Sequence, residues 1–241
     1  MRKALMMAGL LVVFTANIVS AQSVDLNWNE CSGGTLDAAD KTTACTSNTG
    51  FNHLIASFYA GPGVTNLESI EVIIDYQVAG GILPCWWDLK DGSTRAAALV
   101  ILDTDPGDPG SGLPLFKCPN NFFLDRAGAG VGGMVQTGAD RGRFAAAIAL
   151  GSGQGAAPAS GEEYACGFRI TNALTTTCTG CTQPAVFVLN RVTLGQPGQP
   201  SIELNSPQNN NCTSWRSATG VNCGAVPTRK STWGSLKALY R

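Results

Sequence analysis

The amino-acid sequence predicts an all-β protein folded as a single antiparallel β-sandwich. Three observations favour this class. Apolar and polar residues alternate along several short stretches, which is typical of strands with one buried face. The chain holds 29 glycines and 12 prolines, many of them in turn-like clusters such as 61–63 and 151–155. No convincing amphipathic helix precedes the C-terminal segment.

The first half of the chain contains four expected strands. Residues 24–28 (VDLNW), 54–58 (LIASF) and 70–78 (IEVIIDYQV) alternate with period two, so each should have one wet face. Residues 97–102 (AALVIL) form a continuous apolar run, as expected for a strand covered on both faces.

The second half contains four more. Residues 144–150 (FAAAIAL) and 164–170 (YACGFRI) alternate, 185–189 (AVFVL) is a continuous apolar run, and 201–204 (SIEL) is short. About eight strands in one domain fit a jelly-roll-like or cohesin-like sandwich.

The N-terminus predicts export. Arg2 and Lys3 precede an apolar run over residues 4–14, and small side chains lie just before Gln22, which together describe a secretory signal peptide over residues 1–21. The run is short for a bilayer span, although a retained N-terminal anchor is the alternative. Beyond it we expect no transmembrane segment, a sandwich domain over 22–205, a polar linker and disulfide loop over 206–226, and a basic amphipathic tail over 227–241.

Export makes disulfides the default interpretation of the nine cysteines. Because nine is odd, at least one cysteine is free or pairs between chains, and the alternation around Cys166 favours it as the unpaired thiol, on the buried face of a strand. A redox motif or a zinc site at residues 178–181 is a less favoured alternative. Pairing of sequence neighbours predicts the bonds Cys31–Cys45, Cys85–Cys118, Cys178–Cys181 and Cys212–Cys223.

The tail is the most unusual segment. It carries four basic residues and no acidic one, whereas residues 22–226 carry ten basic and seventeen acidic residues. Three roles stay open: sorting or surface attachment, packing on its own domain, and membrane-surface binding. Ser231 or Thr232 can cap a short helix whose side chains form the candidate attachment tail: Trp233, Leu236, Lys237, Leu239, Tyr240 and Arg241.

This tail, Trp-Gly-x-x-Lys-x-Leu-Tyr-Arg after the segment 227–230, resembles the end of assorted uncharacterised secreted proteins of bacteria. The body resembles them also, at residues 24–31, at the Trp86-Trp87 pair and at residues 178–190. The resemblance covers most of the chain and implies a secreted β-sandwich. It transfers no activity, because the family has none established. Cys85 departs from the polar residue expected before the tryptophan pair.

Two groups of residues are candidate ligand sites. Asp103, Asp105 and Asp108 lie in a Gly/Pro-rich loop, where three close carboxylates suit calcium, the one cofactor that the sequence suggests; a solvated acidic loop is the alternative. Tryptophans near polar loops can stack on sugar rings, and the candidates are Trp86 or Trp87, with Trp215 as a companion. Because neighbours on a strand face opposite sides, one of the adjacent pair should belong to the core.

Charge and histidine content exclude several classes of function. A formal net charge of −1 argues against a nucleic-acid binder that neutralises many phosphates. The single histidine, His53, rules out sites with two or three imidazoles, and its place at a strand start favours a surface or turn role.

Catalytic motifs are sparse. No Gly-x-Ser-x-Gly elbow and no phosphate loop occur. Glu162 and Glu163 should diverge on a strand, and nothing in the sequence pattern brings Asp75 and Asp88 together as a carboxylate pair. The sequence therefore favours a secreted or surface-attached, non-catalytic protein that acts by structural or adhesive interaction. A carbohydrate-binding module comes second and a glycan-active hydrolase third. The expected partners are an extracellular glycan or a surface protein.

Overall fold

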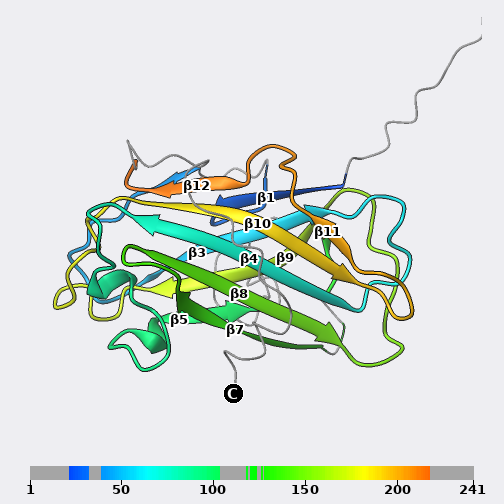
Figure 1. Cartoon of the computed structure of the whole chain (residues 1–241), viewed down its shortest axis with the longest axis horizontal. Helices are drawn as coiled ribbons and strands as arrows, with labels where there is room; N and C mark the ends of the chain where they lie inside the picture. The colour runs from blue at the N-terminus through cyan, green and yellow to red at the C-terminus, as the bar shows by residue number, and fades with distance from the viewer. Residues whose placement is uncertain are drawn as a thin grey trace, which may run out of the picture.

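The protein consists of two β-sheets packed face to face (Figure 1). The computed structural model describes residues 22–32, 39–103, 118, 120–123, 126 and 128–217. The smaller sheet has the order β1 (Ser23–Trp28), β3 (Phe51–Tyr59), β9 (Glu162–Thr171), β5 (Leu99–Leu102), and β6 (Asn120–Asn121) also pairs with β9. The larger sheet has the order β2 (Asp40–Lys41), β12 (Cys212–Trp215), β10 (Ala185–Gly195), β4 (Ser69–Val78), β8 (Arg141–Leu150), β7 (Gly128–Gln136), and β11 (Ile202–Leu204) also pairs with β10.

Almost all strand pairs are antiparallel, as the sequence predicted. The two short parallel pairs among the described strands are β2 with β12 and β6 with β9. Two 3-10 helices, η1 (Cys85–Trp87) and η2 (Ala96–Ala98), lie between β4 and β5. No helix in the described ranges is long and apolar enough to cross a membrane.

The core lies between the sheets and is lined by the alternate residues that the sequence pattern marked. On β4, for example, Ile70, Val72 and Ile74 are at most 1% exposed. Phe144 of β8 stacks on Phe168 of β9 across the sandwich, with ring centroids 5.4 Å apart. The period-two pattern therefore predicted the buried faces because each strand must present one face to the opposite sheet.

All eight predicted strands are present, but the first two residues of the 97–102 run belong to η2 and the other four form β5. The structure adds β2, β6, β7 and β12. Strand β7 (GAGVGGMVQ) was missed because glycines interrupt its apolar pattern. At Gly132 they are required: a Cβ would lie 2.6 Å from the Ala145 carbonyl oxygen and 2.8 Å from Ile101 Cγ1.

The predicted linker is wrong over its first half, because residues 206–217 belong to the sandwich. The backbone N–H groups of Val24 and Leu26 donate to the carbonyls of Ser206 and Asn210, at 2.9 and 2.7 Å. This segment covers the free edge of β1, which an edge strand otherwise leaves unpaired. It also buries Asp25 on the outer side of β1, where the wet face was expected. The chain then returns as β12 to pair with β10.

Three of the four predicted disulfide pairings are wrong. The bonds join Cys31 to Cys118, Cys45 to Cys181 and Cys85 to Cys178, across sequence separations of 87, 136 and 93 residues. Sequence neighbours fail as a guide because antiparallel strands bring distant loops to the same end of the sandwich. Cys212 is also disulfide-bonded, and its predicted partner, Cys223, lies outside the described residues.

The prediction for the odd cysteine is confirmed. Cys166 is free and completely buried on β9. Burial raises the pKa of its thiol well above the ordinary value, because the thiolate has lost its water. The disulfides among the remaining cysteines support an oxidising compartment.

Gly132→Ala should lower the free energy of unfolding by about 1–3 kcal/mol, because the new methyl group collides with backbone of β8 and with β5. The matched control is Gly133→Ala on the same strand, where a Cβ meets nothing within 4 Å. Urea unfolding of both variants measures the difference. Equal stabilities would contradict the close approach of β7 to its neighbours.

Candidate functional site

Three loops gather at one end of the sandwich. They are the β2–β3 loop with the first residue of β3 (42–51), the first part of the β4–β5 loop (79–87) and the β9–β10 loop (172–184). The strand register brings them together. At this end of the sandwich, Phe51 pairs with Thr171 in the smaller sheet, and Val78 pairs with Ala185 in the larger sheet. We call these three segments the stapled loops.

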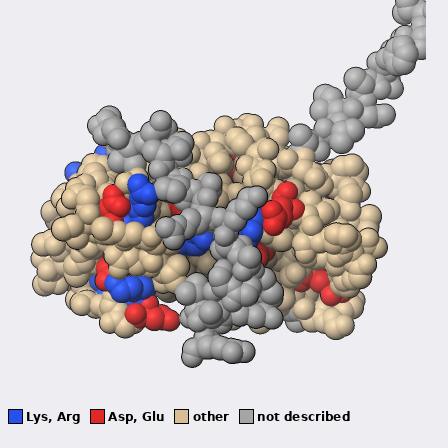
Figure 2. All heavy atoms as spheres, in the orientation of Figure 1, with Lys and Arg blue, Asp and Glu red and all other residues tan. Residues whose placement is uncertain are grey.

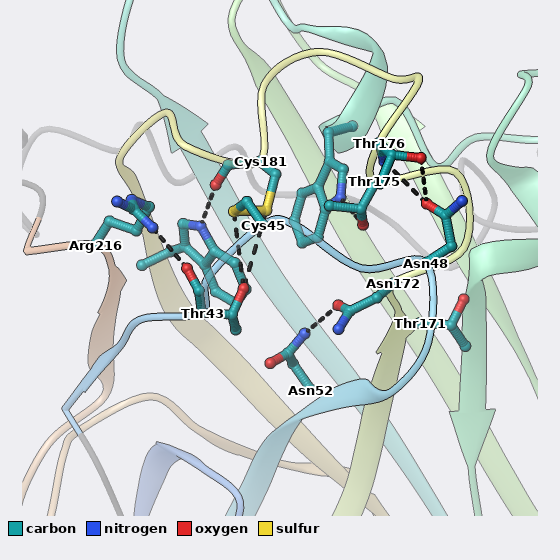
Figure 3. The surroundings of a disulfide bond; sticks show 12 residues. Thr43, Cys45, Asn48, Asn52, Thr171, Asn172, Thr175, Thr176, Cys181 and Arg216 are labelled. Atoms are coloured by element: carbon teal, nitrogen blue, oxygen red, sulfur yellow. Dashed lines mark hydrogen bonds between the residues drawn. A yellow bond between two sulfur atoms is a disulfide. The ribbon is translucent and has the colours of Figure 1, made fainter.

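Two disulfides hold the stapled loops to one another. Cys45–Cys181 joins the β2–β3 loop to the β9–β10 loop (Figure 3). Cys85–Cys178 joins the β4–β5 loop to the same β9–β10 loop. The β9–β10 loop is therefore bonded on two sides. Such cross-links limit how far the loops can separate without unfolding the strands beneath them.

Polar side chains add hydrogen bonds between the same loops. Asn48 Oδ1 accepts from the backbone N–H and the hydroxyl of Thr176, at 2.9 and 3.1 Å (Figure 3). Asn172 accepts at Oδ1 from Asn52 Nδ2, at 3.0 Å, and donates from its own Nδ2 to the Thr49 carbonyl, at 3.0 Å. These bonds fix the β2–β3 loop and the β9–β10 loop relative to each other.

A buried arginine supports the loops from below. The Arg95 guanidinium donates to the carbonyls of Trp86, Thr171 and Ala173, and it lies 4.3 Å from the centre of the Trp86 ring. Burial lowers the pKa of Arg95 to about 10, because the charged form has lost its water. The side chain thus supplies hydrogen-bond donors to carbonyl groups of two loops at once.

The three candidate tryptophans are all buried, so the prediction that they form a sugar-binding platform is wrong. Trp86, Trp87 and Trp215 are each 0% exposed. The first two lie in η1 rather than on a strand, and one tight helical turn directs both rings into the core. Their role is support: Trp86 Nε1 donates to Thr175 Oγ1 at 2.9 Å, and Trp215 Nε1 donates to the Cys181 carbonyl at 2.7 Å.

The stapled loops are uncharged, whereas the rest of the β4–β5 loop (88–98) carries Asp88, Lys90, Asp91 and Arg95. Residues 42–51, 79–87 and 172–184 contain no Asp, Glu, Lys or Arg, and threonine, serine and asparagine are frequent among them. Three of the four exposed large hydrophobic side chains in the described residues lie on these segments: Phe51, Ile82 and Leu174, which are 37%, 72% and 39% exposed. Leu174 has φ +61°, a left-handed conformation that is uncommon outside glycine.

The charges of the protein lie elsewhere. In the view of Figure 2, basic and acidic side chains form small mixed groups rather than a patch of one sign. The stapled loops therefore offer hydroxyl groups, amides and a few apolar side chains on a fixed backbone. This chemistry suits contact with an uncharged surface more than it suits proton transfer or metal binding.

His53 is not at the surface, contrary to the prediction. It lies on β3 and is 2% exposed. Burial, with smaller contributions from Arg169 and Lys41, lowers the pKa of His53 to about 4, so its imidazole is neutral at pH 7.

The candidate carboxylates are engaged in separate contacts. Glu162 accepts from Ser57 Oγ and the Ser32 backbone N–H, and Glu163 accepts from the Ala159 backbone N–H. Asp75 and Asp88 are in ion pairs with Arg143 and Lys90. The structure assembles none of these into a pair facing the stapled loops.

The predicted calcium site cannot be placed as a whole. Asp103 follows β5, and Asp105 and Asp108 lie outside the described residues. No group of three metal-ligating side chains occurs among the residues with defined positions. The tail residues from Trp233 to Arg241 also lie outside the described part, so the calcium site and the attachment role stay predictions.

Neither a protein-family model nor a curated protein sequence matches the chain. Three solved structures show weak similarity. A cohesin module from the family 33 glycoside hydrolase of Clostridium perfringens ATCC13124 has 9% identity and a TM-score of 0.36, over 80% of this chain and 94% of that one. The second type II cohesin module of the cellulosomal adaptor ScaA scaffoldin of Acetivibrio cellulolyticus has 9% identity and a TM-score of 0.33, over 79% and 94%. ACE19, the collagen binding subdomain of the Enterococcus faecalis surface protein ACE, has 8% identity and a TM-score of 0.25, over 73% and 92%.

Arg95→Met should lower the free energy of unfolding by about 3 kcal/mol, because carbonyl groups of Trp86, Thr171 and Ala173 lose a buried donor. Lys90→Met, which removes a half-exposed ion pair with Asp88, should change it by less than about 1 kcal/mol. Chemical denaturation of the oxidised proteins tests both. A small effect at Arg95 would show that the loops do not depend on it.

His53→Gln should make the protein less sensitive to mild acid. The unfolded chain binds a proton at the ordinary imidazole pKa of 6.5, whereas the folded chain resists it down to about 4, so native stability falls as pH falls through this window. The chain has one histidine, so the variant removes the whole imidazole contribution. Melting temperatures between pH 7 and pH 4.5 measure the effect. Parallel curves for the two proteins would contradict the buried neutral state.

Proposed function

We propose that the protein is an exported, non-catalytic β-sandwich that acts by adhesive contact, and that the stapled loops are its contact surface. One observation carries this proposal: two disulfides fix three neighbouring loops whose exposed surface is uncharged and bears Phe51, Ile82 and Leu174. Loops on a rigid scaffold are a common location for binding residues. A surface fixed before contact loses little conformational entropy on binding, which favours affinity.

The lack of charge on these segments limits the classes of partner that they can bind. Charged partners are selected mainly through complementary charge, and the stapled loops have none to offer. An uncharged polymer or the neutral region of a protein surface fits better. Threonine hydroxyls and asparagine amides can hydrogen-bond to such a surface, while the apolar side chains exclude water from it.

Carbohydrate binding is the second candidate, and the hydroxyl-rich and amide-rich loop surface favours it. A neutral glycan offers hydroxyl groups that pair with threonine and asparagine, and its apolar ring faces pack on aliphatic or aromatic side chains. In this version the contact residue among the aromatics is Phe51, which is 37% exposed, rather than any of the buried tryptophans.

Ile82→Asp and Leu174→Asp should each weaken adhesion at least tenfold, because a charge at the centre of an apolar contact must be desolvated. Val131→Asp is the matched control: Val131 is 58% exposed and lies on β7, away from the stapled loops. Two measurements apply to all three variants. Sedimentation velocity detects self-association, and depletion onto insoluble cellulose, chitin or mannan detects glycan binding.

The outcomes separate the candidates. Loss of self-association in the loop variants alone supports the adhesive role, and loss of saturable glycan depletion alone supports the carbohydrate-binding role. An equal loss in Val131→Asp would place the contact elsewhere and sink the proposal for the loops. New reducing ends during incubation with glycan would show catalysis and overturn the non-catalytic assignment.

A further inference from the structure

The larger sheet has an outer face whose central side chains are buried. On β4 and β8 the residues that enter the core are the even-numbered ones, so Ile73 and Ala145, which pair with each other, point away from it. They are nevertheless 2% and 3% exposed. Val186 and Val188 of the neighbouring β10 also point outward and are 2% and 6% exposed. We call these four residues the outer apolar stripe, although they form two small clusters, Ile73 with Ala145 and Val186 with Val188.

An ion pair on the same face is also buried. Arg143, beside Ala145 on β8, donates to both carboxylate oxygens of Asp75 on β4, at 2.6 and 2.8 Å. Asn190 Nδ2 donates to Asp75 Oδ2 at 2.7 Å. The Arg143 and Asp75 side chains are only 8% and 4% exposed. An outer face open to water would leave such groups much more accessible.

No described strand or 3-10 helix lies across this face. In the ranges that the structure describes, β4, β8 and β10 contact their neighbours in the larger sheet and strands of the opposite sheet. Figure 1 shows β10, β4 and β8 side by side as a broad surface. Lys90 and Asp91 of the β4–β5 loop line a pocket together with Ala145. No described strand or 3-10 helix lies over the rest of the outer apolar stripe, so its cover must come from another segment.

We propose that the C-terminal tail, residues 227–241, packs across the outer apolar stripe of its own domain. Reach permits this. The described residues end at Ser217, just after β12, and β12 lies beside β10 in the larger sheet. Strands are about 4.8 Å apart, so β8 lies about 15 Å from β12, and a helix over residues 232–241 is about 15 Å long. The tail can therefore cross β10, β4 and β8.

A covalent tether places the tail near this face. Cys212 lies on the outer side of β12 and packs with Val186 and Val188. It is disulfide-bonded, and Cys223 is the one cysteine that remains after the three described pairs and the free Cys166. The bond Cys212–Cys223 would hold the chain four residues before Pro227 against the edge of the outer apolar stripe.

The chemistry of the two surfaces matches. The tail offers Trp233, Leu236 and Leu239 at helical spacing, and a helix this short is marginally stable unless its apolar side is covered. The outer apolar stripe is an apolar surface of the corresponding kind. The tail is also purely basic, whereas residues 22–226 carry seven more acidic than basic side chains, so long-range charge favours the contact.

Ala145→Arg should displace the tail, because a long charged side chain then occupies the β8 end of the stripe. Ala149→Arg is the matched control, since Ala149 is on the same strand and the same face but is exposed. Trypsin reports the position of the tail through Arg229, Lys230 and Lys237. Intact mass should show cleavage at Lys237 at least tenfold faster in Ala145→Arg than in the wild type, with Ala149→Arg unchanged.

Tryptophan fluorescence supplies a second readout. Trp28, Trp86, Trp87 and Trp215 are fully buried, so Trp233 is the one remaining tryptophan that acrylamide could reach. Quenching should be weak in the wild type, should increase in Ala145→Arg, and should fall again when Trp233→Phe is added. If Ala145→Arg does not fold, a chain ending at Val226 should bind an apolar dye that the full chain does not.

Three results would overturn the proposal. One is wild-type cleavage at Lys237 as fast as in a free peptide of residues 227–241. Another is wild-type quenching that Trp233→Phe removes. The third is a dimer that Ala145→Arg converts to a monomer, which would make the stripe an interface between two copies of this chain.

Discussion

A buried cluster of four tryptophans connects the parts of this structure that matter for its proposed role. Trp86 lies 4.6 Å from Trp87 and 5.1 Å from Trp215 between ring centroids, and Trp28 lies 5.7 Å from Trp215. These rings come from the smaller sheet, the larger sheet and the β4–β5 loop. Large aromatic side chains bury much apolar surface, so separating any of these elements would expose it to water.

The same cluster positions the loops through its polar edges. Three of the four indole N–H groups have acceptors, which lie in the β9–β10 loop for Trp86 and Trp215 and on β12 for Trp28, whereas Trp87 Nε1 has none among the described residues. The loops that cover the cluster are therefore held by hydrogen bonds from beneath as well as by disulfides. This arrangement explains how a long, polar, threonine-rich loop can keep one conformation without a helix or strand of its own.

Local periodicity was enough to predict the sandwich, the eight main strands and the buried thiol of Cys166, because each depends on which face of a strand a residue occupies. It failed where contacts between distant segments decide the outcome. Cys178 and Cys181 are three residues apart, yet each bonds to a different loop. His53 looked like a surface residue because nothing near it in sequence shows that the outer side of β3 is covered. Both tryptophans of the 86–87 pair are core residues because the chain turns there instead of extending. The one sequence signal of the stapled loops is that three separate segments lack charged residues. This signal can be interpreted only when the three segments are known to be neighbours in the fold.

The burial of the Cys166 thiol affects how long the native disulfide pattern persists. Disulfide exchange begins with attack by a thiolate, and the one free thiol among the described cysteines is both inaccessible and held in its protonated form. The Cys166 thiol therefore cannot reshuffle the bonds of the native protein. Once the cross-links have formed, their pattern should persist for as long as β9 stays within its sheet, and errors made earlier would need an external thiol for repair.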